Sequence, residues 1–280
     1  MSAQGAIVVT GASTGIGAAA ARGLAQMGNV VFAGVRTNDD AVRLAREHAN
    51  LRPLLLDVTQ QPSIAAAAQT VRAAGLRLSG LVNNAGIVVA GPLEHVSESE
   101  LRLQFDVNVL GQITVTQAFL PQLREDRGRI VFVGSVSGRI AMPYIGPYSA
   151  SKFALRALVD ALRFELEPDG IRVALIEPGS VKTPIWRKGR EGHHGRWNAL
   201  TERYRRAMQA VLEQSEREER NAIPADRVTR AIVDALFAAN PRTHYLVGAS
   251  ARLGGTIVPL LPTRLRDAIF RKAMRLGGGK

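Results

Sequence analysis

The sequence lacks cysteine, metal-binding histidine spacings and long apolar runs. The absence of cysteine excludes disulfide bonds, a cysteine-ligated zinc site and a cysteine nucleophile. None of the five histidines takes part in an H-E-x-x-H or similar spacing, so we expect no bound metal. No uncharged apolar run reaches the ~18 residues that a membrane span requires. The first residues do not form a basic and apolar signal sequence, and we therefore expect a cytoplasmic protein.

Lysine is scarce where arginine is common. Residues 1–181 contain 15 arginines but only one lysine, Lys152. An ammonium group is a compact charge that can pass on a proton, whereas a guanidinium group is a rigid fork that stays charged. A single lysine in an arginine-rich stretch therefore indicates a task that arginine cannot perform, with chance occurrence as the alternative.

Positive charge is abundant but unevenly placed. The formal net charge is +12, of which residues 181–280 contribute +11, from 20 basic and 9 acidic residues. The excess lies in the segments 182–206 and 252–280. Such segments favour anionic partners such as phosphorylated ligands, acyl carriers or lipid headgroups, and the alternative is a solvated basic surface. No nucleic-acid recognition motif accompanies the charge, so we expect no nucleic-acid partner.

Short apolar runs alternate with helical segments along the chain. The runs lie at residues 6–10, 29–34, 54–57, 78–83, 128–135, 171–179 and 243–248. Helices are expected after the first run, over about 65–74, over about 99–123, and from Tyr148 to the P-D-G sequence at 168–170. Strands that are nearly all apolar and separated by helices predict a doubly wound parallel sheet of about seven strands, covered on both faces.

Unusual residues follow the predicted strands, at the carboxyl ends where ligands bind in such sheets. After the first strand, the glycines of T-G-A-S-T-G-I-G are Gly11, Gly15 and Gly17. Glycine allows positive φ and a close approach of ligand to backbone, and the helix that follows offers free N–H groups to a pyrophosphate. The stretch therefore predicts a dinucleotide site.

The second strand indicates which dinucleotide binds. An NAD site usually has a carboxylate at this position for the ribose 2′-hydroxyl. Here the strand ends in Gly-Val-Arg-Thr, and no acid occurs before Asp39. Arg36 is placed to pair with a 2′-phosphate, so we predict NADP(H) as the cofactor. The alternative is an ordinary surface arginine.

Tyr148 and Lys152 are four residues apart in Y-S-A-S-K and so share one face of a helix. A tyrosine hydroxyl has a pKa of about 10, and lowering it by ~3 units takes ~4 kcal/mol of preferential phenolate stabilisation. A neighbouring ammonium group shifts the pKa in that direction. Ser135 ends the fifth strand and can hold a substrate oxygen beside the phenol. Asn108 is a poor helix former within the long helix, so it either holds a water near Lys152 or is a satisfied interior amide.

Together these motifs resemble the short-chain dehydrogenase/reductase family over residues 5–185: TGxxxGIG at 10–17, NNAG at 83–86, Asn108, Ser135, YxxxK at 148–152 and PG at 178–179. The resemblance implies a tyrosine general acid/base, an assisting lysine, a serine anchor and an asparagine-held water. It also implies adenine contacts at Asp57 and Val58, a ribose contact at Asn84, and nicotinamide contacts around 178–183. The predicted catalytic residues are Asn108, Ser135, Tyr148 and Lys152. The predicted cofactor-binding residues are Gly11, Ser13, Thr14, Gly15, Ile16, Gly17, Arg36, Asp57, Val58, Asn84, Ala85, Gly86, Tyr148, Lys152, Pro178, Gly179, Val181 and Thr183.

The tail distinguishes branches of this family. The G-x-x-x-x-x-D-G-G segment of the bacterial ketoacyl-carrier reductases is absent. The stretches SASKFAL, ALIEPGSVKT and RTHYLVGASARLGG resemble the retinol and 17β-hydroxysteroid dehydrogenase branch instead. The resemblance implies an NADP(H)-dependent enzyme for a hydrophobic secondary alcohol or ketone, such as a steroid, retinoid or lipid. A 3-ketoacyl thioester reductase and a non-catalytic nucleotide sensor are the alternatives, and we expect a homo-oligomer, either a dimer or a tetramer.

The chain is predicted to consist of a core domain, with a lid over the substrate, and a C-terminal extension. We assign residues 1–250 to an NADP-binding Rossmann domain with a substrate lid at about 182–220, and residues 251–280 to a basic C-terminal extension. Thr263 can cap a helix that runs to about Leu276, with Leu265, Ile269 and Ala273 on one stripe. A basic amphipathic helix of this kind favours peripheral contact with an anionic membrane. The alternative is that the stripe packs on its own domain or on a partner subunit.

Overall fold

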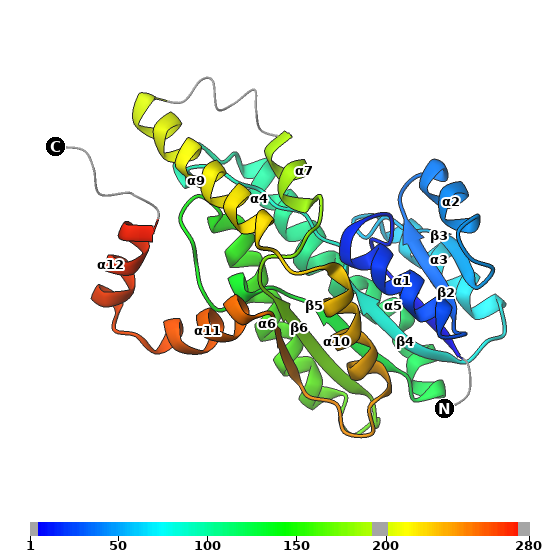
Figure 1. Ribbon diagram of the computed structural model, residues 1–280. Helices are drawn as coiled ribbons and strands as arrows, with labels where there is room; N and C mark the ends of the chain where they lie inside the picture. Colours follow the sequence, from blue (N-terminus) through cyan, green and yellow to red (C-terminus); the bar gives the residue numbers. More distant parts are fainter. Residues whose placement is uncertain (1–4, 192–200, 274–280) are drawn as a thin grey trace.

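Seven parallel strands form one sheet, as predicted (Figure 1). The computed structural model describes residues 5–191 and 201–273. The strands are β1 Ala6–Val9, β2 Val30–Val35, β3 Leu51–Leu55, β4 Leu78–Asn83, β5 Arg129–Val133, β6 Arg172–Pro178 and β7 His244–Val247. Their order across the sheet is β3-β2-β1-β4-β5-β6-β7, so the direction of winding reverses between β1 and β4. This reversal is the place where doubly wound sheets bind ligands.

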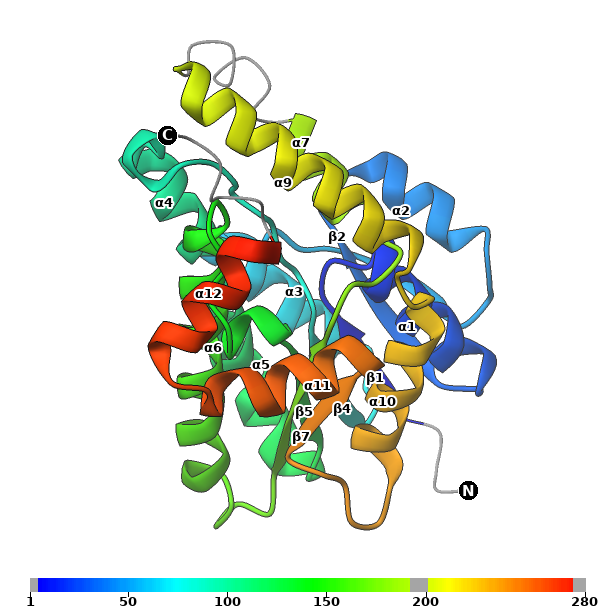
Figure 2. The ribbon, with the colours of Figure 1, turned by 60° about the vertical axis from the view of Figure 1, so that its left-hand side comes forward.

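Helices cover both faces of the sheet, and each face has its own apolar core. On one face, α1 (Gly15–Gln26) lies beside α10 (Ala225–Phe237), as Figure 2 also shows. Leu24 of α1 and Ile232 of α10 are fully buried there. The opposite face is covered by α3 (Gln61–Ala73), α5 (Gly111–Asp126) and α6 (Gly146–Glu165), which bury Val71, Phe119 and Leu155. Because both faces are covered, most strand residues are apolar and buried rather than alternating, and the edge strand β3, with Arg52 and Leu55 exposed, is the exception.

The third strand begins at Leu51, three residues before its predicted start at Leu54. The added residues include Pro53, and proline cannot donate a hydrogen bond to a neighbouring strand. However, β3 is the edge of the sheet and pairs only with β2, so a missing donor on its outer side costs little. The helix after it likewise begins earlier than predicted, at Gln61, because Pro62 suits a first helical turn.

The predicted long helix over 99–123 is divided into two by a π turn. Residues 98–105 form α4 (Glu98–Phe105), Asp106–Leu110 form the π turn, and α5 follows from Gly111. The N–H group of Gly111 bonds the carbonyl of Asp106, five residues earlier. A side chain at Gly111 would meet the Val58 carbonyl at 2.6 Å, so this turn packs closely on the segment after β3. Asn108 lies in the middle of the π turn.

After β6 the chain forms helices that border the carboxyl ends of the strands. These are α7 (Ile185–Glu191) and α9 (Glu202–Arg220), and part of the predicted lid, residues 192–200, falls outside the described residues. Beyond β7 come α11 (Ala249–Ile257), a 3₁₀ turn (Val258–Leu260) and α12 (Thr263–Ala273). α12 begins at Thr263, which is therefore its first helical residue and not the predicted N-cap, and the predicted end near Leu276 lies outside the described part of the chain.

The predicted C-terminal extension is not separate from the core at its beginning. Ala251 and Gly255 of α11 are buried, and a side chain at Gly255 would meet Leu246 of β7 at 2.9 Å and Arg139 at 3.2 Å. Figure 1 shows α11 near the sheet and α12 further out at the left. Within residues 5–191 and 201–273, no helix combines the length and the apolar character that crossing a membrane requires.

Candidate active site

A cavity of about 440 Å³ opens at the carboxyl ends of the strands. It is lined by the segments that follow β1, β2, β3, β4, β5 and β6, together with the first turns of α6 and α7. Every residue predicted to bind the cofactor or to act in catalysis lies on its wall, except Gly17 and Asn108. Segments as far apart in the sequence as Gly11 and Gly189 therefore meet at one site, although the role of each residue stays a prediction.

Gly11 and Gly15 of the glycine-rich loop both need glycine's conformational freedom. Their φ angles are +63° and +61°, in the left-handed region that side chains disfavour. Gly17 has a different task. A side chain there would lie 2.3 Å from the Gly11 carbonyl oxygen and 2.4 Å from the Asn84 amide nitrogen. Gly17 thus lets α1 pack against the loop from behind, and this explains why it does not line the cavity.

The N-terminus of α1 faces the cavity without a capping side chain. Thr14 is the N-cap residue but makes no capping hydrogen bond, and the first turn contains no acidic residue. The initial N–H groups of the helix and its positive dipole end therefore suit a pyrophosphate. The glycine-rich loop is also held by hydrogen bonds from the segment after β4. The Asn84 side chain donates to the carbonyls of Thr10 at 2.9 Å and Gly11 at 3.2 Å. In this structure the Asn84 side chain supports the loop, whereas the family resemblance implied a ribose contact.

Two arginines lie near the end of β2. Arg36 is exposed, lines the cavity and has no ion-pair or hydrogen-bond partner among the described residues. Arg43, which the sequence reasoning missed, donates to the Ser13 carbonyl at 2.7 Å and pairs with Asp40 at 2.9 Å and Glu47 at 3.0 Å. Arg43 is therefore neutralised by two carboxylates, and Arg36 is the cation left available for an anionic ligand.

Tyr148, Lys152 and Ser135 lie together at the inner end of the cavity. All three are at most 8% exposed. The Lys152 Nζ donates to the Val133 carbonyl at 2.9 Å and lies 5.9 Å from the centre of the Tyr148 ring. The Ser135 hydroxyl accepts from the N–H of Ser137 at 3.1 Å, which fixes its direction at the end of β5. These contacts hold a phenol, an ammonium group and a hydroxyl within one small space.

The titration behaviour of this group differs from the sequence-based expectation. Burial raises the pKa of Tyr148, and a hydrogen bond with the Ser135 side chain opposes this effect. Burial also lowers the pKa of Lys152 to about 8. In the protein by itself, Lys152 thus does not lower the pKa of Tyr148 below its ordinary value.

Asn108 is fully buried and its side chain is occupied by protein groups. Its oxygen accepts from the N–H of Ile87 at 2.8 Å, and its nitrogen donates to the Ile87 carbonyl at 3.0 Å and to Ser151 at 3.1 Å. The side chain therefore joins the π turn to the segment after β4 and to α6. These contacts fit the satisfied interior amide, and the water-holding role of Asn108 stays a prediction. It still lies beside the site, since a side chain at Gly86 would meet Asn108 at 3.3 Å and Lys152 at 3.9 Å.

The far part of the cavity is apolar. Its wall is formed by Ile87, Val88, Val89, Leu103, Val107, Ile185 and Trp186, with Glu100 at the margin. The Trp186 ring on α7 meets the Tyr148 ring edge to face, with centroids 5.6 Å apart. α7 therefore covers the hydroxyl-bearing residue of the site with an aromatic side chain.

The residues present fit a nicotinamide dinucleotide. The bare start of α1 suits its pyrophosphate, and the same cavity extends to the buried Tyr148–Lys152 pair. Among the described residues, no group of three or more histidine, aspartate or glutamate side chains could hold a metal ion.

Comparison with known proteins agrees with this reading of the site. Residues 5–194 match the model of the short chain dehydrogenase family. The chain is 40% identical to a 3-amino-tetrahydro-pyrrolizinone reductase of Xenorhabdus hominickii over 88% of its length and 87% of that protein. It is 35% identical to an NADPH-dependent 3-dehydrocapnine reductase of Ornithobacterium rhinotracheale, over 96% of both chains. Identity to human retinol dehydrogenase 16 is 37%, over 94% of this chain and 87% of that one.

A solved structure extends the likeness to three dimensions. A short-chain dehydrogenase from Streptomyces avermitilis superimposes with a TM-score of 0.78 at 27% identity, and both chains are covered completely. The family match, the named reductases and dehydrogenases among the relatives, and the parallel sheet all agree. The chain belongs to the short-chain dehydrogenase family, resembles its retinol dehydrogenases, and is an NAD(P)-dependent oxidoreductase.

Proposed function

We propose that the protein is an NADP(H)-dependent reductase or dehydrogenase for a hydrophobic secondary alcohol or its ketone. The observation that carries the proposal is the placement of Tyr148, Lys152 and Ser135 between the cofactor segment and the apolar wall of one cavity. A carbonyl carbon on that wall would lie next to both a proton donor and a nicotinamide ring. The cofactor supplies or accepts the hydride.

In this proposal the chain itself handles the proton and the substrate oxygen. Tyr148 gives its proton to the carbonyl oxygen in reduction and takes it back in oxidation. The Ser135 hydroxyl donates a second hydrogen bond to that oxygen and so fixes the carbonyl beside the phenol. Lys152, as an ammonium ion, stabilises the phenolate and makes proton release easier. Trp186 and the valines of the wall exclude water from the reacting atoms.

The preference for NADP(H) rests on Arg36. It is the cation without a partner among the described residues at the end of β2, and nearby Asp40 is already paired with Arg43. A 2′-phosphate would complete the pairing of Arg36. The NADPH dependence named for the 3-dehydrocapnine reductase, a relative of 35% identity, supports the same cofactor.

The substrate class rests on the apolar wall and on the relatives. Retinol dehydrogenases act on a lipophilic alcohol, and the two bacterial relatives are named as reductases. A 3-ketoacyl thioester remains the second candidate, because the excess of basic residues after residue 181 would suit an acidic acyl carrier. A non-catalytic nucleotide sensor is disfavoured by the buried Tyr148–Lys152 pair, which a sensor does not need.

The test is a substrate panel followed by one substitution. Steroids, retinoids, ketoacyl thioesters and aryl ketones are incubated with the enzyme, and NADPH absorbance is followed. Tyr148→Phe should then lower kcat on the best substrate by at least ~100-fold while leaving NADPH affinity within twofold, because only the proton donor is lost. No turnover of any member, or a Phe variant that keeps a tenth of the wild-type kcat, would contradict the proposal.

We further propose that α7 and α9 belong to a substrate lid within residues 182–220. The edge-to-face contact of Trp186 with Tyr148 supports this, because α7 must move for a large substrate to reach the phenol. Residues 1–250 would then form the cofactor and catalytic unit, and α11 would support it, as its buried Ala251 suggests.

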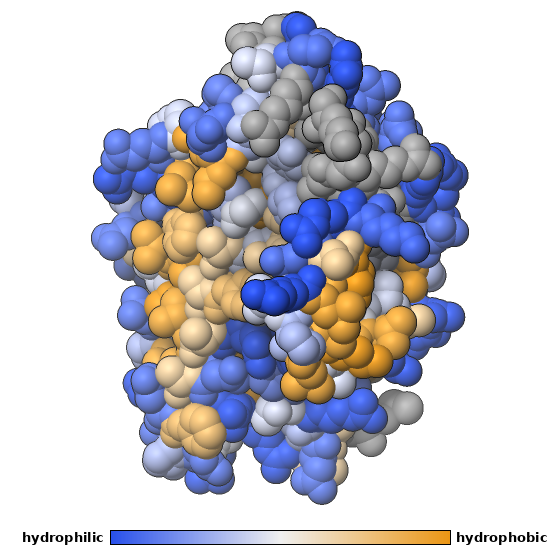
Figure 3. Space-filling model, turned by 90° about the vertical axis from the view of Figure 1, so that its left-hand side faces the viewer, coloured by the Kyte–Doolittle hydropathy of each residue, from blue (hydrophilic) through white to orange (hydrophobic). Residues whose placement is uncertain are grey.

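The C-terminal helices support peripheral contact with an anionic membrane. Leu253, Ile257, Leu260, Leu265 and Ile269 are between 42% and 80% exposed. Exposed basic residues lie among them at Arg252, Arg264, Arg271 and Lys272. Figure 3, viewed from the side that carries α12, shows hydrophobic and strongly hydrophilic side chains next to each other on this face. A membrane with negative headgroups would bury the apolar side chains and pair with the basic ones. A second subunit in a homo-oligomer would mainly bury the apolar side chains.

A further inference from the structure

A buried carboxylate lies directly behind the active site. Glu177 is the last residue but one of β6, and its side chain is 1% exposed. It precedes Pro178 and Gly179, which line the cavity. A buried charge without partners is strongly unfavourable, so its surroundings must satisfy it. The question is why a strand in the apolar core carries an acid at this position.

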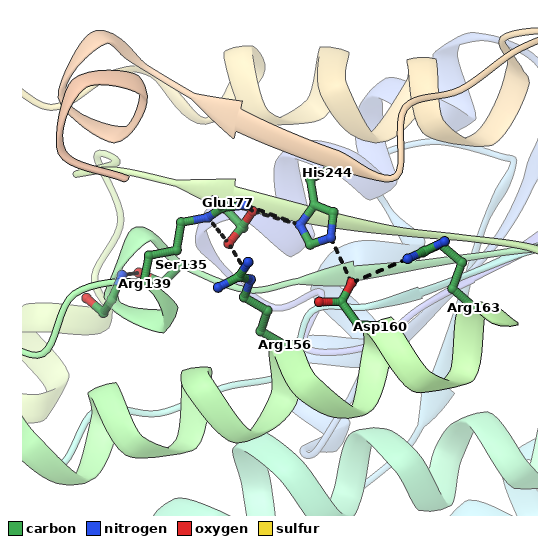
Figure 4. A network of polar contacts seen from close by, with 8 residues as sticks. Ser135, Arg139, Arg156, Asp160, Arg163, Glu177 and His244 are labelled. Atoms are coloured by element: carbon green, nitrogen blue, oxygen red, sulfur yellow. Dashed lines mark hydrogen bonds and ion pairs between the residues drawn. The ribbon is translucent and has the colours of Figure 1, made fainter. Parts of the chain in front are cut away.

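Arg139 satisfies Glu177 with a two-point contact. The Arg139 Nε and Nη2 atoms donate to the two oxygens of Glu177 at 2.7 Å and 2.6 Å. A guanidinium fork that meets a carboxylate in this way allows essentially one relative orientation of the two groups. Figure 4 shows Arg139 reaching Glu177 from the loop that begins at Ser135.

His244 closes the other side of Glu177. Its Nδ1 lies 3.0 Å from Glu177 and its Nε2 lies 2.8 Å from Asp160 of α6. Both ring nitrogens face carboxylates, and only the doubly protonated ring can donate to both. The hydrogen bond to Glu177 accordingly raises the pKa of His244, with burial opposing it. Burial would raise the pKa of Glu177, but the hydrogen bonds from His244 and Arg139 outweigh it and hold that pKa low.

Two further arginines, both on α6, lie near this cluster. Arg156 approaches Glu177 at 3.9 Å, and Arg163 approaches Asp160 at 4.0 Å. On α6, Lys152, Arg156 and Asp160 follow one another at intervals of four residues and so lie along one face. The cluster therefore runs from the helix that carries Tyr148 and Lys152, across β6, to the loop after β5.

Each end of the Arg139–Glu177 contact is linked to the site through a few backbone bonds. Arg139 follows the 3₁₀ turn Val136–Gly138, whose N-cap residue is Ser135. A side chain at Gly138 would meet the Lys152 carbonyl at 2.7 Å, so this turn also lies directly against the catalytic helix. Glu177 precedes the Pro178–Gly179 turn, and Gly179 in turn contacts α11.

We propose that Arg139 and Glu177, backed by His244, are positioning residues that set the separation between Ser135 and the Pro178–Gly179 turn. The inference rests on the proposed roles of these two segments, which would hold the substrate oxygen and the nicotinamide ring. Hydride transfer depends steeply on the distance and orientation of the reacting atoms. Buried ion pairs are an inefficient way to stabilise a fold, because desolvation offsets their attraction. The two-point contact between Arg139 and Glu177 is therefore better explained by a need to hold the two segments in one relative position than by a gain in stability.

The experiment compares Glu177→Gln and Arg139→Lys with wild type, using NADPH and the best substrate of the panel above. Both variants should lower kcat at least tenfold while leaving the Kd for NADPH within threefold, because the pyrophosphate end of the site is untouched. Arg139→Lys keeps the charge but loses the fork, so it should not rescue kcat. The double variant should be no slower than the slower single variant, as expected of residues that act as one unit.

The matched control is Asp169→Asn, which breaks the exposed Arg124–Asp169 pair beyond the other end of α6. It should leave kcat within twofold. Melting temperatures identify the variants that fold. If Glu177→Gln does not fold, the kcat of Arg139→Lys tests the inference by itself, because Arg139 is partly exposed and its replacement disturbs the core less. Folded variants with kcat within twofold of wild type would overturn the inference. If Tyr148→Phe also kept its activity, or no panel member reacted, the proposed function itself would fail instead.

Discussion

Removal of the Arg36 guanidinium should weaken NADPH binding and leave NADH binding unchanged. Arg36 lines the cavity at the end of β2 and has no partner among the described residues, so Arg36→Ala breaks no contact within that part of the protein. The only interaction at risk is the one with the cofactor's 2′-phosphate, which NADH lacks. The variant therefore isolates a single charge.

The size of the effect follows from the exposure of the residue. A hydrogen bond to a charged group contributes ~1.5–3 kcal/mol. Arg36 is exposed, and solvent screening reduces this to ~1–2 kcal/mol. Since ~1.4 kcal/mol corresponds to tenfold in affinity, the Kd for NADPH should rise ~5- to 30-fold. Arg43 lies nearby, but its pairs with Asp40 and Glu47 leave it little net charge to compensate.

The assay is a fluorescence titration of NADPH and NADH, which requires no substrate. Raising the salt from ~0.1 M to ~1 M shortens the screening length from ~10 Å to ~3 Å, so the wild-type preference for NADPH should shrink. Arg46→Ala is the control, because Arg46 is an exposed arginine at the end of α2 (Asn38–Ala45) and does not line the cavity. Equal wild-type affinities for the two cofactors, or an equal loss of both in Arg36→Ala, would refute the assignment.

Two further predictions concern stability and membranes. In the folded state Lys152 has a pKa of about 8, below its ordinary 10.5, so between these pH values the unfolded chain binds more protons than the folded one. The free energy of unfolding should therefore rise with pH in this range. Lys152→Met should therefore stabilise the cofactor-free protein at pH 7 by roughly 2 kcal/mol and remove the increase of stability with pH, while activity is lost. An unchanged or lower melting temperature of the variant in calorimetry would contradict this prediction. On anionic phosphatidylglycerol vesicles, a Leu265→Gln/Ile269→Gln variant should sediment less than wild type, whereas Phe164→Gln, an exposed control on α6, should not differ. Equal sedimentation of all three proteins would remove the membrane role.

The sequence predicts the parts of this protein that depend on local pattern. Apolar runs ending in glycine, asparagine or serine identified the strands and the edge at which they converge. The glycine register was also predictable, because the turn must begin where the first strand ends at Thr10. Cavity-lining residues that follow strands directly, such as Gly11 and Ser135, were among those predicted, whereas those of the apolar wall, such as Val88 and Ile185, were not.

The parts that were missed depend on contacts between distant segments. Glu177 and Arg139 are 38 residues apart, and His244 is a further 67 residues from Glu177, so no spacing relates them. The partners of Asn108, which are Ile87 and Ser151, were equally beyond reach. The start of β3 was misjudged because Pro53 is acceptable only in an edge strand, and position in the sheet is a property of the whole fold.

The π turn at Asp106–Leu110 has a consequence for how this chain tolerates changes in length. A π turn is an α-helix that carries one surplus residue. Deleting that residue would merge α4 and α5 into one regular helix, in which the segments on both sides stay near their present places and the side chains of the former turn point in new directions. Asn108 would then turn away from Ile87 and Ser151, and the segment after β4 would lose its anchor beside Lys152. The variant would have a more regular helix but lower activity, so selection should remove a deletion of a single codon here even though the helix gains regular hydrogen bonding.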